Sequence, residues 1–396
     1  MKTKILRYLK HISLTILALL LIGVAVLLYM GNSVKFNRNY AVNSENLDRE
    51  GPYILYQQDS AVTVNYVQGT EKNGYAVKQE KKTSALTADV FYYGDSSSFT
   101  VDIDPRRNFS PEPGLYHAPG RILAISDIEG GYRSFRNLLI NAKVADAQLN
   151  WIFGHGHLVL LGDFVDRGYF VTQVLYLIYR LELQAEKAGG KVHYILGNHE
   201  IMNMQGDHHY AAGKYSYVSS MLGLRQFQLY DSQHTFLGRW MHSKNVIEKI
   251  GDYIFTHGGL HPDFSTSGLS IDSINRVARA GYDRVYYPAQ GSRRKESELV
   301  LSYEKSPFWY RGFFEDDLSD LAIDSLLDHF NGKQIIVGHT IQSRVRTLYD
   351  GRVIGIDVQH PQEQWGRYFP DVSSQALLIE NGRFFRINDD GDREAL

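Results

Sequence analysis

The chain has 396 residues, of which 43% are hydrophobic and 13% aromatic, enough for a packed core and too many for a disordered protein. Its net charge of −2 provides no overall field that attracts nucleic acid, and the longest basic run, Arg293-Arg294-Lys295, is expected to be a solvated loop. Cysteine is absent, which excludes disulfides, thiolate metal sites and thiol nucleophiles and leaves His, Asp, Glu and Asn to bind any metal.

A basic end and a long apolar run open the chain. The uncharged segment 12–31 has about 20 residues, enough to cross a hydrocarbon core of about 30 Å as a helix. Because basic flanks stay in the cytoplasm, residues 1–40 are predicted to comprise a cytoplasmic end, a transmembrane anchor and a linker, with the remaining chain periplasmic or extracellular. This is the pattern of a single-pass inner (cell) membrane protein. A cleaved signal peptide is the alternative, although no small-x-small cleavage pattern follows the apolar run. The basic residues are Lys2, Lys4, Arg7 and Lys10.

Residues 41–112 are predicted to form a small antiparallel β domain. Val62, Val64 and Tyr66 alternate with polar positions, which is the pattern of a half-buried strand. Asn73-Gly74 supplies turn chemistry between such strands. A proline-rich stretch at 105–114 marks the boundary with the next unit.

Residues 113–396 are predicted to alternate short apolar strands with amphipathic helices. After the first strand, Phe135 and Leu138 belong to one apolar helical face, and a second helix with the same spacing follows the second strand. A final hairpin is expected to turn at Asn381-Gly382. The expected strands are 121–126, 157–161, 191–196, 253–256, 333–337 and 352–357.

Five of these strands run directly into residue types that bind metals. In αβ architectures the carboxyl ends of strands lie along one edge of a sheet, where ligand sites form. Adjacent glycines let backbone and substrate approach closely. The five strand-end motifs are Asp127-Ile128-Glu129-Gly130-Gly131, Gly162-Asp163-Phe164-Val165-Asp166-Arg167-Gly168, Gly197-Asn198-His199-Glu200, His257-Gly258-Gly259 and Gly338-His339-Thr340.

Each motif alone also has an ordinary structural interpretation. A single Asp after a strand is often a helix cap, and a single His such as His257 or His339 is often a hydrogen-bonded core residue. Five such strand ends in order favour a metal centre over these separate interpretations. Three histidines near the motifs are expected to be structural or solvated: His208, His209 and His261.

The motif series GDxxDRG, GNHE, HGG and GHT resembles the calcineurin-like metallophosphoesterases, specifically the serine/threonine-type phosphoprotein phosphatase branch. The resemblance covers roughly residues 121–357. The stretches IMNMQGDHHY and SPFWYRG are similar to those of the bacterial Shewanella-like members of that branch, and the preceding β unit faintly resembles the fibronectin-like module of purple acid phosphatases. The implied fold class is α+β: a metallophosphatase β-sandwich flanked by helices, preceded by a small all-β domain and one transmembrane helix.

The resemblance also implies a role for individual residues. His199 would be the general acid and Asp166 would orient it. Arg167 and Arg311, together with Asn198, would bind the substrate phosphate. The implied metal ligands are Asp127, Glu129 and the bridging Asp163 for one ion, and Asp163, Asn198, His257 and His339 for the other.

General chemistry supports these roles. Two cations about 3.5–4 Å apart can share a hydroxide that attacks phosphorus, so no covalent Ser or Cys is needed. Guanidinium groups suit bidentate phosphate recognition. For Arg311, which lies in the aromatic stretch PFWYRGFF, a cation–π or ion-pair role is the alternative.

One position departs from the family pattern, which is Asp-x-His at the first motif. This chain has Asp127-Ile128-Glu129, and the harder, charged glutamate favours Mn²⁺, with Mg²⁺ or iron as alternatives. If Glu129 instead turned away, the first metal site would be weak or empty.

These observations predict a membrane-anchored, metal-dependent phosphomonoesterase acting on phosphorylated protein or a small phosphoester. Sequence alone does not choose among phosphoserine, phosphothreonine and phosphotyrosine, nor does it give the oligomeric state. The rivals are a dinucleoside-tetraphosphate hydrolase, a lipid-linked pyrophosphate hydrolase and a non-catalytic, metal-stabilised binding protein. A nuclease is disfavoured because the chain has no basic groove sequence.

Overall fold

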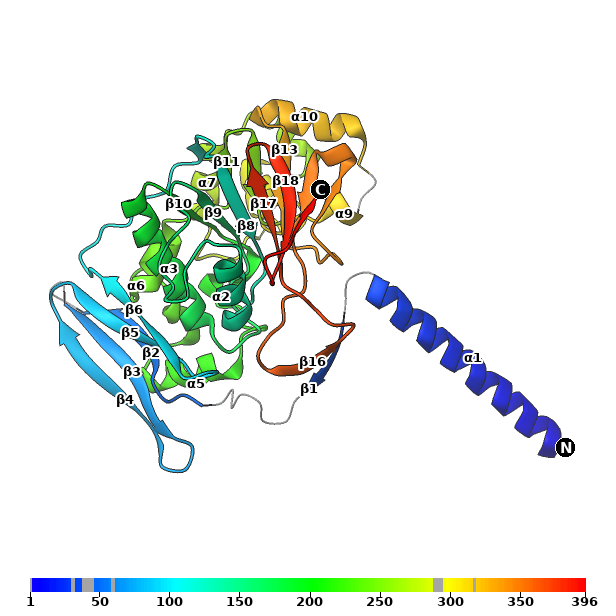
Figure 1. The fold of residues 1–396 in the computed structure, drawn as a ribbon, viewed down its shortest axis with the longest axis horizontal. Helices are drawn as coiled ribbons and strands as arrows, with labels where there is room; N and C mark the ends of the chain where they lie inside the picture. The colour runs from blue at the N-terminus through cyan, green and yellow to red at the C-terminus, as the bar shows by residue number, and fades with distance from the viewer. Residues whose placement is uncertain (1, 30–32, 38–45, 58–60, 288–294, 316–317) are drawn as a thin grey trace.

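The protein is described from a computed structural model (Figure 1). Arg293, Arg294 and the first residues of the predicted β unit, from 41 to 45, lie outside the described part of the chain. The described residues are 2–29, 33–37, 46–57, 61–287, 295–315 and 318–396.

Two six-stranded sheets form the centre of the described molecule. The first has the order β10-β9-β8-β17-β18-β19 and the second β14-β15-β13-β12-β11-β7. The first comprises β8 Arg121–Ile125, β9 His157–Leu161, β10 Lys191–Ile195, β17 Gln375–Glu380, β18 Arg383–Asn388 and β19 Arg393–Ala395. The second comprises β7 Leu115–Tyr116, β11 Ile247–Ile250, β12 Tyr253–Thr256, β13 Gln334–Val337, β14 Arg346–Leu348 and β15 Val353–Gly355. Each strand expected from 121 to 357 is present, and so is the hairpin at Asn381-Gly382.

The two faces of each sheet carry different cores because side chains alternate along a strand. On β8, Ile122 and Ala124 belong to an apolar cluster with Phe255 and Ile336 of the second sheet. Leu123 and the other alternate residues face the helices and join the larger cluster. This layered burial makes the centre a sandwich flanked by helices, the mixed α/β architecture expected from the sequence.

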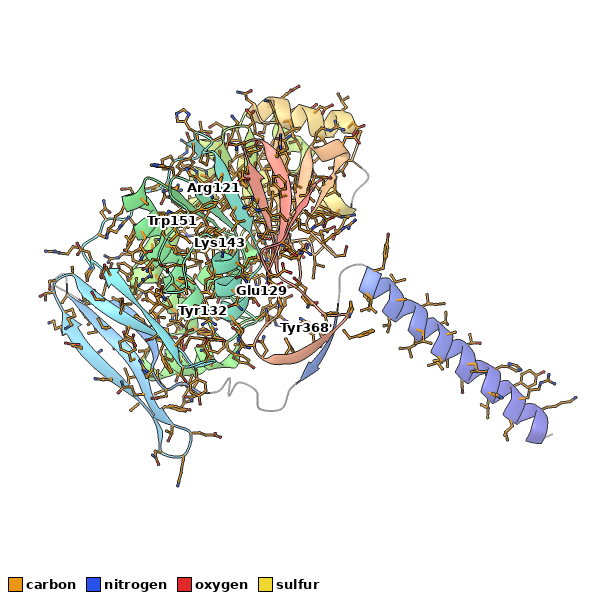
Figure 2. All side chains as sticks on the ribbon, viewed as in Figure 1. Arg121, Glu129, Tyr132, Lys143, Trp151 and Tyr368 are labelled. Carbon is orange, nitrogen blue, oxygen red and sulfur yellow. The ribbon has the colours of Figure 1, made fainter. Side chains whose placement is uncertain are left out.

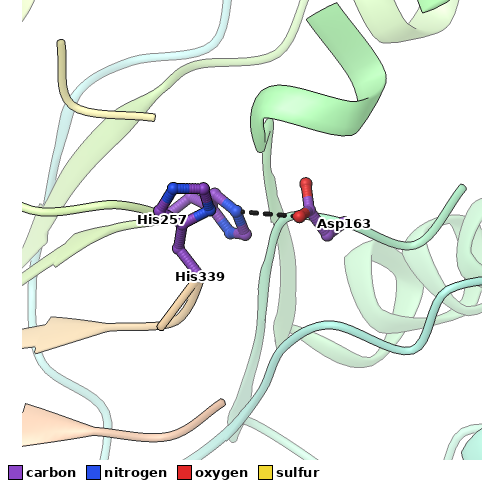
Figure 3. A group of neighbouring side chains, drawn as sticks. All are labelled: Asp163, His257 and His339. Carbon is purple, nitrogen blue, oxygen red and sulfur yellow. Dashed lines mark ion pairs between the residues drawn. The ribbon is translucent and has the colours of Figure 1, made fainter. Parts of the chain in front are cut away.

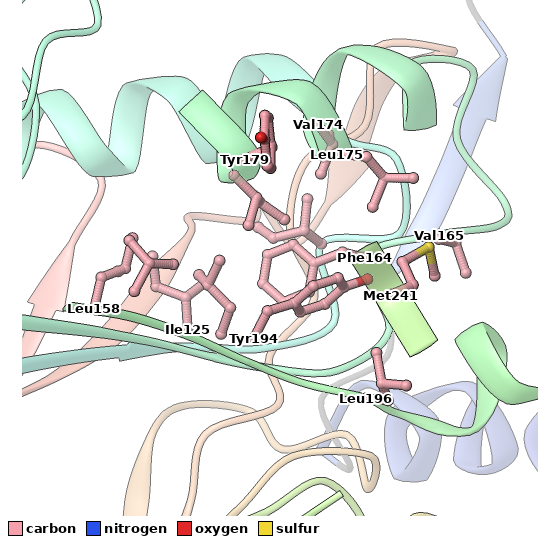
Figure 4. Close-up of a cluster of buried hydrophobic side chains, with 14 of the residues drawn as sticks. Ile125, Leu158, Phe164, Val165, Val174, Leu175, Tyr179, Tyr194, Leu196 and Met241 are labelled. Atoms are coloured by element: carbon pink, nitrogen blue, oxygen red, sulfur yellow. The ribbon is translucent and has the colours of Figure 1, made fainter. Parts of the chain in front are cut away.

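Helices cover the outer faces of the sandwich. Val174 and Tyr179 of the long helix α3 lie over Leu158 and neighbouring strand residues (Figure 4). α3 ends where Gly189 adopts a left-handed backbone with φ 76°, a conformation that glycine tolerates without strain. The helices are α2 Tyr132–Asn141, α3 Val171–Ala188, α4 Asn198–Gln205, α5 Gly213–Met221, α6 Phe236–His242, α7 Ile271–Arg279, α8 Lys295–Leu301, α9 Gly312–Glu315 and α10 Asp320–Phe330.

Antiparallel strands also form an N-terminal β layer, defined as β2–β6. It comprises β2 Glu50–Tyr56, β3 Val62–Thr70, β4 Gly74–Lys82, β5 Leu86–Tyr92 and β6 Ser97–Ile103. The buried Glu50 carboxylate accepts hydrogen bonds from Thr172 at 2.7 Å and from Lys214 at 3.0 Å, which ties the layer to α3 and α5. The predicted strands are therefore present, while their status as a separate domain, 41–112, stays a prediction.

The N-terminal apolar segment forms one helix, α1 Lys2–Tyr29, whose described side chains are almost all exposed. Its part Leu6–Tyr29 is long and apolar enough to cross a membrane, a property that a signal sequence shares. Beyond it the chain differs from the predicted linker. β1, Val34–Asn37, pairs antiparallel with β16, Trp365–Phe369, at the other end of the sequence (Figure 1).

Candidate active site

The strand ends from both sheets meet at one cavity of about 290 Å³. β8 and β9 deliver Asp127 and Asp163 from the first sheet, and β13 delivers His339 from the second. The structure brings together all the residues that the sequence predicted, including three that do not line the cavity: Asp166 contacts His199, His257 contacts Asp163, and Asn198 contacts His257. The lining residues are Lys35, Asp127, Glu129, Asp163, Arg167, His199, Arg311, His339, Ile341, Asp357, Val358, Gln359, His360 and Gln362.

The backbone at this edge is held in an unusual conformation. Left-handed φ values cost energy for residues other than glycine, and they concentrate at functional sites. Close approach also requires glycine: a Cβ on Gly197 would lie 2.3 Å from Asp163 Oδ1, and one on Gly338 would lie 2.8 Å from Asp127 Oδ2. The site residues with positive φ are Asp127 at 55°, Glu129 at 50°, Asp163 at 57°, Asp166 at 69°, Arg167 at 52° and His339 at 63°.

One side of the cavity, the histidine half, combines imidazoles with Asp163 and Asn198. Donor atoms of Asp163, His257 and His339 all lie within 4.8 Å of one another (Figure 3). His257 Nε2 is 3.1 Å from Asp163 Oδ2 and 3.0 Å from Asn198 Oδ1. His257 Nδ1 is 2.6 Å from the Leu161 carbonyl oxygen, so its proton is donated there and Nε2 is the nitrogen that faces the ligands.

Burial and neighbouring charges set the charge states of the histidine half. Burial, reinforced by His257 and Arg311, lowers the pKa of His339, so this imidazole is neutral, the form that binds metals. Burial opposes the charged form of His257, but Asp163 and Asp127 raise its pKa to about 10. Burial likewise opposes ionisation of Asp163, yet His257 and His199 hold the pKa of this carboxyl below its usual range. Asp163 therefore stays an anion.

The other side of the cavity, the carboxylate half, gathers Asp127, Glu129, Asp163 and Asp357. Burial raises the pKa of Asp127 to about 6 and that of Glu129 to about 7, despite His257 beside the first and Arg167 beside the second. Burial also raises the pKa of Asp357, and Asp127 and Glu129 add to this effect. Carboxylates crowded in this way need a counter-ion, and oxygen donors fit a hard divalent cation. The group Asp163, His257 and His339 could hold one metal ion, and a second ion among the carboxylates stays a prediction.

Sequence reasoning missed Asp357 as a site residue. It lies two residues after β15, is 6% exposed, and its carboxylate has no hydrogen bond or ion pair among the described residues. The signal was present, since the predicted strand 352–357 ends in Asp, one of the metal-binding residue types that also follow the other five strands. Only its lack of a neighbouring His, Asn or second acid set this strand end apart.

His199 is held as a protonated acid. Its Nδ1 is 2.7 Å from Asp166 Oδ2, and Asp166 Oδ1 accepts a hydrogen bond from Asn203 Nδ2 at 2.7 Å. Burial works against the imidazolium, but Asp163 and Asp166 raise the pKa of His199 to about 9. The ring therefore carries its proton at neutral pH, with Nε2 facing the cavity. Asn203, which the sequence did not single out, lies one helical turn after His199 on α4.

The two predicted phosphate-binding arginines both line the cavity. Arg167 forms an ion pair with Glu129 and lies 5.4 Å from the Tyr210 ring centroid. Arg311 donates to the His339 carbonyl oxygen at 2.6 Å and to Thr340 at 3.3 Å. Glu129 thus points into the cavity rather than away from it.

Glu200 is a structural residue that the sequence quoted without a role. Its buried carboxylate accepts hydrogen bonds from the backbone N–H groups of Asp163 at 2.9 Å, Phe164 at 2.8 Å and Gly197 at 2.8 Å. It therefore ties the GDFVDRG loop to the GNHE loop and sets the spacing between them. The GNHE motif was the signal for it.

The three additional histidines have structural contacts or exposure, as predicted. His261 Nδ1 accepts a hydrogen bond from the Asp263 backbone at 3.1 Å, at the start of a short 3-10 turn. His208 Nδ1 lies 3.3 Å from Asn203 Oδ1, and exposed His209 packs edge-on against Tyr210.

Comparison with known proteins agrees with this geometry. Residues 120–343, more than half of the chain, match the family described as calcineurin-like phosphoesterase. The chain belongs to that family. It is accordingly a phosphoric ester hydrolase of the metallophosphatase type, and the resemblance inferred from the motifs is confirmed.

Two of the relatives are named as Shewanella-like protein phosphatases. The chain is 26% identical over 338 residues to Shewanella-like protein phosphatase 2 of Arabidopsis thaliana, covering 71% of this chain and 82% of the relative. It is 28% identical over 239 residues to Shewanella-like protein phosphatase 1 of Plasmodium berghei, covering 56% of this chain and 62% of the relative. A crystal structure of a cold-active protein-tyrosine phosphatase from a psychrophilic Shewanella species matches with TM-score 0.74 and 31% identity, covering 88% of this chain and 99% of that one.

Proposed function

We propose that this metallophosphatase is a two-metal phosphomonoesterase that dephosphorylates protein side chains, with phosphotyrosine preferred. The observation that carries the proposal is the position of His199, whose Nδ1 lies 2.7 Å from Asp166 Oδ2 and whose Nε2 lies 3.7 Å from Asp163 Oδ2, which suits a general acid. A structural metal site needs no such acid, whereas hydrolysis of a phosphoester needs one for the leaving oxygen.

The two halves of the cavity would hold one cation each. Asp127, Glu129, Asp163 and Asp357 would bind one, and Asp163, Asn198, His257 and His339 the other. When bound, the cations neutralise phosphate charge and activate the attacking water. The hard donors of the carboxylate half favour Mn²⁺ or Mg²⁺ there.

The chain's own residues would do the remaining work. Arg167 and Arg311 orient the phosphate oxygens from two sides of the cavity and stabilise their developing charge. His199 donates its proton to the leaving oxygen, and Asp166 keeps the imidazole oriented and charged. Glu200 holds the two loops that carry these groups in fixed spacing.

Two observations support phosphotyrosine as the preferred group. The Shewanella structure that covers 88% of this chain at 31% identity is described as a protein-tyrosine phosphatase. Aromatic side chains also flank the cavity: the Tyr210 ring lies 5.0 Å from that of His199, and the Trp309 ring lies 5.6 Å from that of His339. Such rings suit a flat aryl ester better than the short aliphatic side chain of serine.

We also propose that α1 remains as the anchor, with the active site on the far side of the inner (cell) membrane from the N-terminus. The apolar stretch Leu6–Tyr29 and the basic residues before it support this orientation. The orientation can be tested by introducing a cysteine into the catalytic region and treating intact cells with a thiol reagent that does not cross the inner membrane. We expect this cysteine to be labelled, and its protection from the reagent would contradict the orientation.

The substrate assignment can be tested on the full chain in detergent, loaded with Mn²⁺. Hydrolysis of a phosphotyrosine peptide is compared with that of the matched phosphothreonine peptide and an aryl phosphate, beside His199→Ala. We expect kcat/KM highest for the phosphotyrosine peptide and a loss of about 10²–10⁴-fold in kcat for His199→Ala. Faster hydrolysis of the phosphothreonine peptide would overturn the preference, and equal activity of His199→Ala would overturn the role of the acid.

A further inference from the structure

The strand that directly follows the apolar helix forms part of the active-site wall. α1 ends at Tyr29 and β1 begins at Val34. In the antiparallel pairing of β1 with β16, Lys35 lies opposite Tyr368. β16 in turn follows the segment 357–362, five residues of which line the cavity. The N-terminal strand is thus built onto the active site from outside the sandwich.

Specific contacts couple this two-stranded sheet to the carboxylate half. The Tyr368 hydroxyl accepts a hydrogen bond from the Gln362 backbone at 2.8 Å. The Gln362 side-chain amide donates to the Glu129 carboxylate at 3.2 Å, so Glu129 and Tyr368 are linked through one residue (both labelled in Figure 2). Ser33 also donates to the Gln359 side chain, ahead of β1. The position of β1 is therefore determined by the same segment that orients a metal ligand.

Lys35 extends from β1 into the cavity that contains Arg167 and Arg311. Its Nζ lies 5.8 Å from the Trp365 ring centroid, which braces the side chain. Burial lowers the pKa of Lys35, while Glu129 raises it and Arg167 lowers it. Two divalent cations would balance the four carboxylates of the cavity. Besides the protonated His199, the positive side chains then left on the cavity lining for a substrate are Lys35, Arg167 and Arg311.

We propose that Lys35 is a substrate-binding residue, a third cation that contacts the phosphate of the bound phosphoester beside Arg167 and Arg311. A lysine ammonium is a compact charge on a flexible stem, so it can follow the phosphate without the fixed geometry of a guanidinium. The inference rests on the proposed function for its substrate, but phosphate binding itself can be measured without turnover.

The position of Lys35 in the chain limits how far the phosphate site can lie from the end of the apolar helix. Lys35 follows Tyr29 by six residues, and six extended residues span at most about 20 Å. The phosphate site therefore opens within about 20 Å of the end of the apolar helix. An anchored chain would accordingly act on phosphoesters presented near the bilayer surface.

The test uses the full chain in detergent, loaded with Mn²⁺, as wild type, Lys35→Met, Lys35→Arg and the control Lys187→Met. Lys187 is an exposed lysine in the last turn of α3, away from the cavity. Inorganic phosphate binding is measured by calorimetry, and phosphotyrosine-peptide kinetics are measured in parallel. We expect Lys35→Met to weaken phosphate binding and to raise KM by about tenfold each, the size of one lost charge-assisted hydrogen bond, with kcat within about threefold.

The remaining outcomes are decisive. Lys35→Arg should stay within about threefold of wild type, since it keeps the charge, and Lys187→Met should match wild type. Equal phosphate affinity in Lys35→Met and Lys187→Met would overturn the inference. A fall in kcat with unchanged phosphate affinity would also overturn it, because that pattern belongs to a structural role. Wild type that binds phosphate without turnover would instead count against the proposed function alone.

Discussion

The two halves of the active site share Asp163 and otherwise differ in chemistry. The histidine half adds His257 and His339 to the shared carboxylate, and each imidazole is oriented by a backbone carbonyl: Leu161 for the former and Trp309 for the latter. The carboxylate half has oxygen donors only, and burial raises the pKa of its acids. One half is thus organised before a metal binds, while the other is a set of crowded acids that a metal would organise.

This difference concerns metal choice more than reaction type. Imidazole nitrogens accept several transition metals, whereas an all-oxygen site selects hard cations such as Mn²⁺ and Mg²⁺. Of the residues proposed to handle substrate, Arg167 contacts the carboxylate half at Glu129, Arg311 contacts the histidine half at His339, and His199 is oriented by Asp166, which belongs to neither half. We therefore expect substitutions in the carboxylate half to change which metal binds, and to change the rate of hydrolysis only as a consequence.

Asp163→Asn should have the largest effect, because it removes the one charge that both halves share. We expect both ions to be lost and kcat/KM to fall by at least about 10⁴-fold, since each ion contributes several kcal/mol to phosphoryl transfer. Metal content by mass spectrometry and peptide hydrolysis measure the two effects. Glu80→Gln on the exposed strand β4 serves as control and should match wild type. Retention of both ions in Asp163→Asn would show that the carboxylate is not shared.

Glu129→His should make the metal preference of the carboxylate half more like that of the histidine half. With a nitrogen donor at this position, the preference of the carboxylate half for Mn²⁺ over Zn²⁺ should fall by about tenfold. The histidine half should keep its own preference. Competitive titration of the metal-stripped protein with both ions gives the two preferences. An unchanged ratio would mean that Glu129 does not bind the ion.

Asp357→Asn tests the ligand that the sequence did not reveal. Removing one of several carboxylates should weaken Mn²⁺ binding to the carboxylate half by about tenfold, with the histidine half unaffected. Calorimetric titration should resolve the weakened site from the intact one. The same affinity at both sites would assign Asp357 a packing role only.

The pH dependence of metal binding should also separate the halves. A metal must displace the protons held by Asp127, with a pKa of about 6, by Glu129, with a pKa of about 7, and by Asp357, whose pKa burial raises, so affinity there should rise by more than about tenfold per pH unit between pH 6 and 7. His257, with a pKa of about 10, must also lose a proton, so affinity of the histidine half should keep rising through pH 8, by about tenfold per pH unit. Calorimetry between pH 6 and 8 measures both slopes, and equal slopes would contradict the assignment.

Much of the geometry of the candidate site was predictable from the sequence because each predicted ligand follows a short apolar strand. Asp127, Asp163 and His339 stand where strands end, and parallel strands bring such ends to one edge. The glycines beside them were equally visible, and Gly197 and Gly338 do lie where a Cβ would meet a ligand. The fold of the sandwich followed from the same alternation of strands and helices.

What the sequence did not reveal depends on contacts between distant segments. Asp357 joins the site only because β15 lies beside β13 in the second sheet. β1 lies in a stretch whose sequence is typical of a polar linker, and its partner β16 is near the other end of the chain. No local sequence pattern therefore predicts the pairing. Glu200 stood inside a predicted motif, yet its role requires seeing three backbone N–H groups converge on one carboxylate.

The most direct test of a two-metal hydrolase is a titration of Mn²⁺ into the metal-stripped full chain while phosphotyrosine-peptide hydrolysis is followed. The account predicts negligible turnover without metal and a rise that saturates at two bound ions per chain. His199→Ala should bind the same two ions and remain about 10²–10⁴-fold slower. Binding of two ions by wild type without hydrolysis of any phosphoester would contradict the account and identify the chain as a metal-stabilised binding protein.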